Sequence, residues 1–436
     1  MQSISRVVWL RRILRRADGP LEQVWAAVSV TLLSLPACSV GTLSGPVPSG
    51  DAAGNSGDNT DVAACATDAV TETCWCGGEQ ITSGYCCAGI AQLDVCSPVV
   101  VDGFGLLPIG LRDKLKWPFA TSSIWNTPIG TAAIYAPAGI LLNNDSGWNT
   151  VFILDQDIIL FEPTQPFTEV YFNNVGWTGG DRCVLQGAVI ATVPVPHDYV
   201  VPNSGGNNSA AFLLPDGRTI KQNQPFTRCT AGEPATAWFT FADEDIYGAG
   251  IGGAHAGSGL SAVGGTIRLG EFTSGRIHHA MKANLWAKEY YHCCDYRWPA
   301  RNVDGYADAT SYGGINPDFV MGALLALLPS FDVDPLQTTP GRILAQAFKD
   351  YGAYVMDDSF SNSWAVATER GPNGRVVDEF AGLYGFSMEQ RLQKHPAFMS
   401  DLQVIFESLH IVTNNSPDTV GGGGSPRVPL APEIGN

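Results

Sequence analysis

The reactive side chains of this sequence gather between residues 252 and 300, where histidine, glutamate, arginine and lysine are mixed with aromatic residues around a glycine-rich segment. Glu271 follows a short predicted strand and is a candidate general acid or nucleophile. Arg268 can position this carboxylate or bind a substrate carboxylate. His279 can exchange a proton near neutral pH. The types and spacing predict acid–base chemistry, although a surface Arg268–Glu271 ion pair explains two of the residues equally well.

A helix predicted over residues 276–291 would position the histidine. At 100° per residue, His279, Trp286 and Tyr290 fall on one arc, so an imidazole would lie in line with two rings that can hold a sugar. The alternative is a hydrogen-bonded core histidine with two packing aromatics. His278 points elsewhere on this wheel, beside Lys282.

Further candidates lie within this helix and on both sides of it. Asp304 offers a second carboxylate, which hydrolysis of a glycosidic bond requires. Trp298, Lys282 and His255 are candidate substrate-binding residues, since an aromatic ring, a cation and an imidazole can all contact a glycan.

Other residues and motifs give weaker or negative signals. Asp357 and Asp358 follow a predicted strand and are interpreted as its solvated end. The sequence has no nucleophile elbow, phosphate-binding loop, zinc-peptidase motif or dinucleotide fingerprint. We therefore predict no metal ligands and no cofactor.

The composition limits the function classes. The chain has 436 residues, of which 45% are hydrophobic, enough for a large core. Lys and Arg number 25 against 42 Asp and Glu, which gives a net charge of -17. Because the only basic cluster lies near the N-terminus, we expect no nucleic-acid partner.

The first 38 residues are typical of an export signal. Five arginines precede an apolar run at 24–35, and Leu35-Pro36-Ala37-Cys38 resembles the lipobox of bacterial lipoproteins, in which the cysteine is lipidated. The run is too short to span a bilayer, which takes about 20 residues. We expect a cell-surface, outer-membrane, periplasmic or extracellular protein whose membrane contact is through this lipid alone.

The cysteine count agrees with export. Setting Cys38 aside, the chain has an even number of cysteines, and an oxidising compartment predicts that all form disulfides of undetermined connectivity. They are Cys65, Cys74, Cys76, Cys86, Cys87, Cys96, Cys183, Cys229, Cys293 and Cys294. The first six fall in a module too small to fold on its core alone.

The rest of the chain predicts a large β-rich domain. Strand-length apolar runs dominate its first half, hairpins are expected at 212–220 and 364–380, and further helices are expected from Thr339-Pro340 to Gly352 and from Pro396. This pattern predicts a mainly β, jelly-roll-like antiparallel β-sandwich with flanking helices in the C-terminal half. The expected boundaries are a signal at 1–38, a tether at 39–61, the cysteine-rich module at 62–98, the large domain at 112–420 and an irregular tail at 421–436.

The order of motifs in the large domain resembles a widespread family of secreted bacterial proteins of unassigned activity. The motifs are Trp125-Asn126-Thr127-Pro128, Pro215-Asp216-Gly217, Ile267-Arg268 with Glu271, His279-Ala280 and Trp298-Pro299-Ala300. The cysteine-rich module resembles small modules of secreted bacterial proteins. The resemblance implies one domain over residues 117–412. It also implies a histidine before the Pro-Asp-Gly turn in several relatives, where this chain has Asn207, Asn208 and Ser209.

Together these features predict a carbohydrate-active enzyme that cleaves an extracellular polysaccharide. Hydrolysis would use Glu271 with Asp304. Elimination from a uronate would use His279 or Tyr290 as base and Arg268 to neutralise the substrate. The alternative is a surface glycan-binding or adhesion protein without catalysis.

Overall fold

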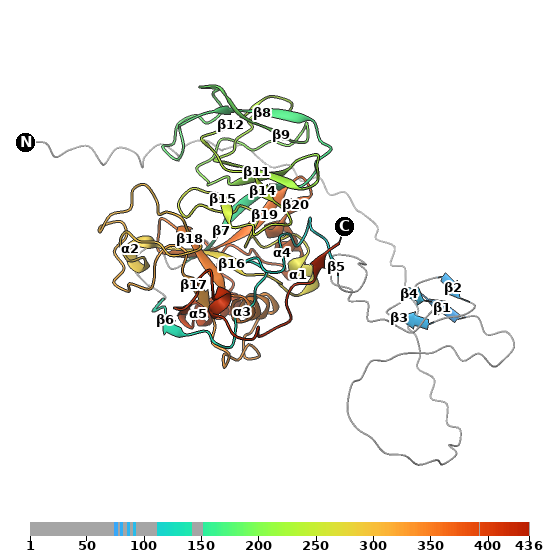
Figure 1. Ribbon diagram of the computed structural model, residues 1–436, viewed down its shortest axis with the longest axis vertical. Coiled ribbons are helices and arrows are strands. Elements are labelled where there is room, and N and C mark those ends of the chain that lie inside the picture. The colour runs from blue at the N-terminus through green and yellow to red at the C-terminus, as the bar shows by residue number, and fades with distance from the viewer. Residues whose placement is uncertain are drawn as a thin grey trace, which may run out of the picture. The chain divides into compact units, whose positions relative to one another are not determined.

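The computed structural model describes residues 111–141, 151–391 and 393–435, and the backbone of four short strands between residues 74 and 92. The predicted signal with Cys38, the tether and the side chains of the cysteine-rich module lie outside the described residues. Figure 1 shows a lobe of strands β8, β9 and β12 beside a larger part that holds the long strands and the helices.

A mixed sheet of twelve strands forms the centre of the large domain. Its longest pairing joins β7 to β19 in parallel, and β16 runs antiparallel to β19 but parallel to β18. In spatial order the sheet contains β13 (Phe239–Thr240), β11 (Thr219–Gln224), β10 (Ala210–Leu213), β7 (Val151–Leu160), β19 (Ser363–Gly371), β16 (Met281–Leu285), β18 (Ala353–Asp358), β17 (Leu324–Ala326), β21 (His410–Val412) and β6 (Tyr135–Pro137). Two short strands extend it, β14 (Glu244–Asp245) beside β11 and β20 (Gly374–Arg375) beside β19.

The remaining strands form small sheets. β12 (Ala235–Ala237), β8 (Phe167–Phe172) and β9 (Val189–Pro194) make a three-stranded sheet that packs on β7 and β10 through a separate apolar core. β22 (Glu433–Ile434) pairs with β5 (Leu111–Arg112), so the predicted irregular tail returns to the start of the domain. β1 (Cys74–Cys76) pairs with β2 (Glu79–Ile81), and β3 (Tyr85–Cys87) with β4 (Ile90–Gln92); β15 (Gly252–His255) is a separate short strand.

The mainly β class is confirmed, with 30% of the described residues in strands and 14% in helices. The large sheet is mixed rather than purely antiparallel. Local hairpins reveal antiparallel neighbours in a sequence, whereas the parallel pairs here join segments as far apart as 151–158 and 363–370. The body contains the disulfides Cys183–Cys229 and Cys293–Cys294.

Five α-helices occur in the described part of the chain: α1 (Glu271–Ser274), α2 (Ala287–Tyr290), α3 (Thr339–Asp350), α4 (Val376–Tyr384) and α5 (Pro396–Glu407), with a 3₁₀ turn at Val420–Gly422. The two predicted C-terminal helices are confirmed as α3 and α5. The side chain of Thr338 caps α3 by accepting a hydrogen bond from the Gly341 N–H. None of these helices combines the length and apolar character needed to cross a bilayer.

Two local predictions are wrong. Residues 276–291 form the buried central strand β16 and the short helix α2, because pairing with strands on both sides overrides their helix propensity. Residues 376–380, expected as a strand, begin α4, where Asp378 and Glu379 lie in the first turn and favour the helix dipole.

The two faces of the large sheet differ in character. Helices α3 and α5 pack side by side and cover one face with an apolar core that includes Trp364 and Phe406 (Figure 1). Loops and β15 cover the other face, where a second core surrounds Trp125 and Tyr354. Polar side chains occupy part of this second face, beside its core.

Candidate active site

The predicted catalytic residues Glu271, His279 and Arg268 lie together but bind one another and their neighbours. Glu271 Oε2 accepts a hydrogen bond from the Arg268 backbone N–H at 2.7 Å and lies 3.1 Å from His279 Nε2. His279 Nδ1 donates to the carbonyl of Ala280 at 2.9 Å. Arg268 Nε donates to Glu369 Oε2 at 2.7 Å. The prediction of proximity is therefore confirmed, but both imidazole nitrogens are occupied.

Charge pairing explains this arrangement. Burial opposes ionisation of Glu271, but His279 and the Arg268 N–H outweigh it and lower the pKa of the carboxyl group. Burial also opposes the imidazolium, but Glu271 outweighs it and raises the pKa of His279. The exposed fractions of the two residues are 2% and 6%, and the small pocket that reaches His279 is bordered by Trp117 and Trp125. The geometry is that of a structural ion pair.

The predicted substrate-binding residues are dispersed. His279 precedes β16 and Trp286 follows it, so the arc expected on one helix face does not form. Trp286 and Trp298 are half-buried against the apolar core. Tyr290 is buried, and its hydroxyl donates to a backbone carbonyl. Lys282 and His255, by contrast, meet at a buried polar centre.

That centre is organised by Asp157. Lys282 Nζ donates to Asp157 Oδ2 at 2.9 Å and to the Ser261 carbonyl at 2.7 Å, and Thr266 Oγ1 donates to the same carboxylate at 2.6 Å. His255 Nε2 lies 2.9 Å from Asp157 Oδ1. Burial raises the cost of ionising Asp157, but Lys282 and then His255 outweigh it and lower the pKa of Asp157. An ionised Asp157 therefore fixes the orientation of His255.

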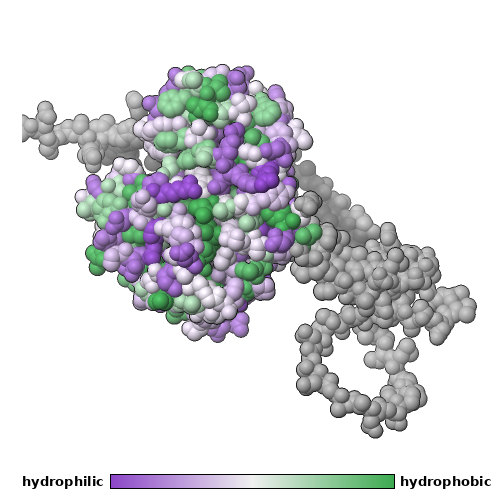
Figure 2. All heavy atoms as spheres, viewed as in Figure 1, coloured by the Kyte–Doolittle hydropathy of each residue, from purple (hydrophilic) through white to green (hydrophobic). Residues whose placement is uncertain are grey.

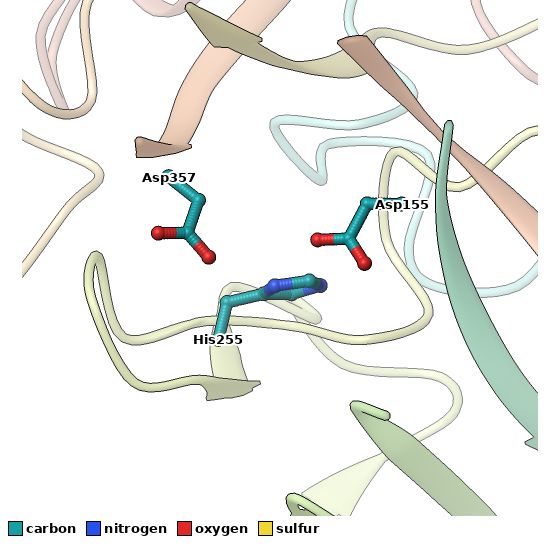
Figure 3. A group of neighbouring side chains, drawn as sticks. All are labelled: Asp155, His255 and Asp357. Carbon is teal, nitrogen blue, oxygen red and sulfur yellow. The ribbon is translucent and has the colours of Figure 1, made fainter. Parts of the chain in front are cut away.

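Two more carboxylates face the same imidazole. Figure 3 shows Asp155 and Asp357 directed toward a common space beside the ring of His255. One oxygen of each carboxylate and one nitrogen of His255 lie within 4.8 Å of one another. Asn207 Nδ2 donates to Asp155 Oδ2 at 2.7 Å and to Asp357 Oδ2 at 3.0 Å. These carboxylates and the imidazole are the described residues that can hold a metal ion, in contrast to the expectation of none.

A β-bulge directs Asp357 into this group. Ala283 lies opposite Val355, but the next residue, Asn284, lies opposite Asp357, so Met356 is an extra residue in β18. Residues that face each other across two strands share a face of the sheet. The bulge thus places Asp357 on the polar face with Asn284.

Small residues on the intervening strand let side chains approach across it. Ala367 lies opposite Asp155, and Ala365 lies opposite Asn284. Because neither alanine projects beyond its Cβ, the Asn284 amide reaches over β19 to within 3.5 Å of Asp155.

A second pair of carboxylates is more exposed. Asp304 accepts a hydrogen bond from the Tyr312 hydroxyl at 2.5 Å, and Asp358 accepts one from the Tyr306 hydroxyl at 3.1 Å. The Tyr306 hydroxyl also interacts with Asp304, so the two carboxylates converge on one phenol. We call Asp155, Asp304, Asp357 and Asp358 the carboxylate cluster.

Gly257 allows a loop to close over this cluster. A Cβ at this position would lie 2.7 Å from Asp304 Oδ1 and 3.2 Å from Asp357 Oδ1. Only glycine fits so close to both oxygens, which also shows that Asp304 and Asp357 are neighbours.

Burial and mutual repulsion change the acidity of the cluster. Burial raises the pKa of each of its four carboxyl groups, and for Asp357 the charges of Asp304 and Asp155 raise it further. In the part of the chain that the structure describes, no lysine or arginine forms an ion pair with any of the four. Any negative charge that the cluster carries is therefore not balanced by an ion-paired lysine or arginine among the described residues.

Exposed aromatic rings lie on two sides of the cluster. Trp177 is 41% exposed, and its Nε1 donates to Asn207 Oδ1 at 3.0 Å, the same amide that joins Asp155 to Asp357. Tyr306 and Phe360 are 44% and 75% exposed, with ring centroids 5.6 Å apart. In the view of Figure 2, hydrophilic residues gather across the middle of the molecule's surface, below the lobe of β8, β9 and β12.

Sequence analysis identified Asp304 and His255 but missed most of this cluster. The available signal was Asp155 and Asp157 in VFILDQDIIL, where two acidic residues interrupt a strand that is otherwise apolar. Asp357 and Asp358 were interpreted as a solvated strand end, and the structure shows Asp357 to be 8% exposed. The bulge that turns Asp357 inward has no local sequence signature.

Comparison with protein-family models, with curated proteins and with solved structures finds no match for this chain. The resemblance drawn from the order of its motifs therefore stays a prediction, and the function has to be argued from the geometry of the carboxylate cluster.

Proposed function

We propose that the protein is an exported glycan-cleaving enzyme that hydrolyses its substrate at the carboxylate cluster. The observation that supports this most directly is the convergence of Asp304 and Asp358 on the Tyr306 hydroxyl, beside exposed aromatic rings. Of the residues predicted from sequence, Asp304 and His255 keep a place in the proposed site, whereas Glu271, His279 and Arg268 lose theirs.

Glycoside hydrolysis needs two carboxyl groups with different tasks. One donates a proton to the leaving oxygen as the C–O bond breaks, while the other takes a proton from the water that attacks the anomeric carbon. Asp304 and Asp358 are half-buried, each is bound to a tyrosine, and both border solvent. They meet the requirement for two neighbouring, accessible carboxyl groups.

The exposed rings fit sugar binding. A pyranose presents a flat patch of C–H groups that packs on an aromatic face, as other apolar surfaces do. Phe360 has a positive φ of 58°, which is rare for a bulky residue, and its N–H is bound to Asp358 Oδ1 at 2.9 Å. The carboxylate thus holds the loop in a conformation that presents the ring to solvent.

Hydrolysis fits the arrangement better than elimination does. Elimination from a uronate needs a free base and a cation for the substrate carboxylate. The proposed bases His279 and Tyr290 are buried and hydrogen-bonded, and Arg268 is bound to Glu369. The groups assigned to that mechanism are therefore committed to the fold.

Export and lipid anchoring through Cys38 remain part of the proposal. The disulfides Cys183–Cys229 and Cys293–Cys294 support an oxidising compartment, since such bonds persist outside the cytosol. The net charge of -17 favours a glycan over a nucleic acid as partner.

The test is a reducing-sugar assay of the purified chain on a panel of neutral and uronate-containing polysaccharides, with absorbance at 235 nm followed in parallel. We expect reducing ends without a rise in absorbance, and a loss of about 10²- to 10⁴-fold in Asp304→Asn or Asp358→Asn. Asp334→Asn, an exposed carboxylate in a surface turn, is the matched control.

Other outcomes point elsewhere. A rise at 235 nm would replace hydrolysis by elimination. Retention on a glycan without turnover in any assay would support the glycan-binding or adhesion protein, in which Trp177, Tyr306 and Phe360 act alone.

A further inference from the structure

We propose that Asp155, His255 and Asp357 form a binding site for a divalent transition-metal ion, with Mn²⁺ the ion that the donor set fits best. Its ligands are different residues from the acid–base pair Asp304 and Asp358, although they belong to the same carboxylate cluster, and the proposal does not rest on the proposed function. Its three donors come from β7, β15 and β18, and Figure 3 shows them directed toward one space.

The contacts of the two ring nitrogens of His255 support metal ligation. Its Nε2 lies 2.9 Å from Asp157 Oδ1 and 3.2 Å from the Lys282 ammonium. When Nε2 donates its proton to Asp157, Nδ1 carries a lone pair, and the Ser209 hydroxyl lies 3.4 Å from Nδ1. Metal-binding histidines are oriented in this way, by a carboxylate that accepts the other N–H.

An independent observation comes from Asn284. Its side chain is 4% exposed, and its Oδ1 makes no hydrogen bond to any described residue, although its Nδ2 lies 3.5 Å from Asp155. An unpaired buried carbonyl oxygen is costly. Because Asn284 lies directly opposite Asp357 in the sheet and its amide reaches Asp155, we include this unpaired oxygen as a candidate further ligand.

The negative charge of the neighbouring carboxylates also favours a bound cation. Asp155 and Asp357 lie beside Asp304 and Asp358, and the Lys282 ammonium, which also acts on Asp155, is bound to Asp157. Like charges held together in a poorly solvated place are relieved by protonation or by a counter-charge. A divalent cation between Asp155 and Asp357 supplies it where the two carboxylates face each other.

The chemical types of the donor atoms limit which metal ions fit the site. Two carboxylates with an amide oxygen favour Mg²⁺, Ca²⁺ or Mn²⁺, whereas an imidazole favours a transition metal. Mn²⁺ satisfies both preferences. It is also the better first probe, because Zn²⁺ prefers nitrogen and sulfur ligands and this site offers one nitrogen and no sulfur.

The experiment is calorimetric titration of the EDTA-treated full chain with Mn²⁺, then with Zn²⁺ and Ca²⁺, and melting curves with and without each ion. We expect one Mn²⁺ per chain, weaker Ca²⁺ binding, and a melting temperature that rises with Mn²⁺ and falls back with EDTA. Asp155→Asn and Asp357→Asn are expected to weaken Mn²⁺ binding by more than about 10-fold. Asp358→Asn removes the same charge from the adjacent residue and should weaken it far less.

Two results would overturn the proposal. One is the absence of both heat and a melting shift with all three ions, which would mean that protons balance the carboxylates. The other is Mn²⁺ binding that survives in Asp155→Asn and in His255→Gln. If Asp357→Asn does not fold, Mn²⁺ binding by the Asp155→Asn and His255→Gln variants tests the proposal in its place. Because no glycan is present, the outcome is independent of the activity assay.

Discussion

Two buried groups of charges in this protein have opposite balance. Glu271 and His279 form a closed pair in which each charge stabilises the other. Asp155 and Asp357 face each other with a bridging amide and no ion-paired lysine or arginine among the described residues. A balanced pair contributes to folding alone, whereas unbalanced charge held in place by a rigid sheet marks a position where a proton, cation or substrate completes the structure.

The largest effect that tests this comparison is on stability. Glu271→Gln leaves the imidazolium of His279 buried without its partner, so we expect a loss of about 3–5 kcal/mol in the free energy of unfolding. Urea denaturation of the variant and the wild type measures it. The double variant Glu271→Gln/His279→Gln, which removes both charges, should lose less. Unchanged stability with lost glycan cleavage would return this pair to the active site.

The same pair predicts how stability depends on pH. Because the pKa of Glu271 is lowered on folding, its contribution exists above its ordinary value of 4.5 and is lost as pH falls through the folded value. Because the pKa of His279 is raised, its contribution exists below 6.5 and is lost as pH rises through the folded value. Arg268 and His278 also face Glu271 or His279 and modify both transitions.

Urea midpoints measured from pH 3 to 9 should therefore show the greatest difference between wild type and Glu271→Gln between these two ordinary values. A difference that is constant over the whole range would contradict charge pairing as its cause.

A smaller effect is expected at the aromatic rings. Phe360→Ala removes an exposed ring next to Asp358, and we expect KM for the glycan to rise by roughly 2- to 10-fold, corresponding to about 0.5–1.5 kcal/mol for one aromatic contact. Phe167→Ala, which removes a ring that is 58% exposed on β8, is the control. Equal changes in both variants would remove Phe360 from the proposed substrate site.

The smallest effect should have the opposite sign to the first. In the presence of EDTA, Asp357→Asn relieves repulsion with Asp155 and Asp304 while keeping an acceptor for Asn207, so stability should stay within about 1 kcal/mol of the wild type or increase. Urea denaturation alongside Glu271→Gln makes the contrast direct. A loss as large as that of Glu271→Gln would mean that both groups are balanced by their surroundings.

The sequence predicted the features that depend on neighbours in the chain. Thr and Pro residues before amphipathic segments gave α3 and α5, and alternating runs gave the mainly β class. The helix predicted over residues 276–291 is wrong because pairing with β18 and β19, which lie far away in the sequence, determines the structure of this segment. The residues of the segment favour a helix by themselves, so they do not reveal this pairing.

The prediction of the candidate site from the sequence was partly wrong for the same reason. Arg268, Glu271 and His279 were correctly placed together because few residues separate them. Asp155 and Asp357 lie on β7 and β18, and the strand order places β19 and β16 between these two strands. Asn207 binds both carboxylates from a third segment. The spacing of these residues along the chain does not predict that they lie close together.

The extra residue in β18 makes the site depend on how the strand is paired as well as on which residues it contains. If the bulge straightened with every residue kept, Met356 would lie opposite Asn284, and Asp357 would lie opposite Leu285, which belongs to the apolar core. A related chain that lacked the residue at position 356 would pair regularly and would still place its aspartate opposite Asn284. Alignments of related chains should therefore allow a one-residue gap at position 356 and look for the acid that lies opposite Asn284.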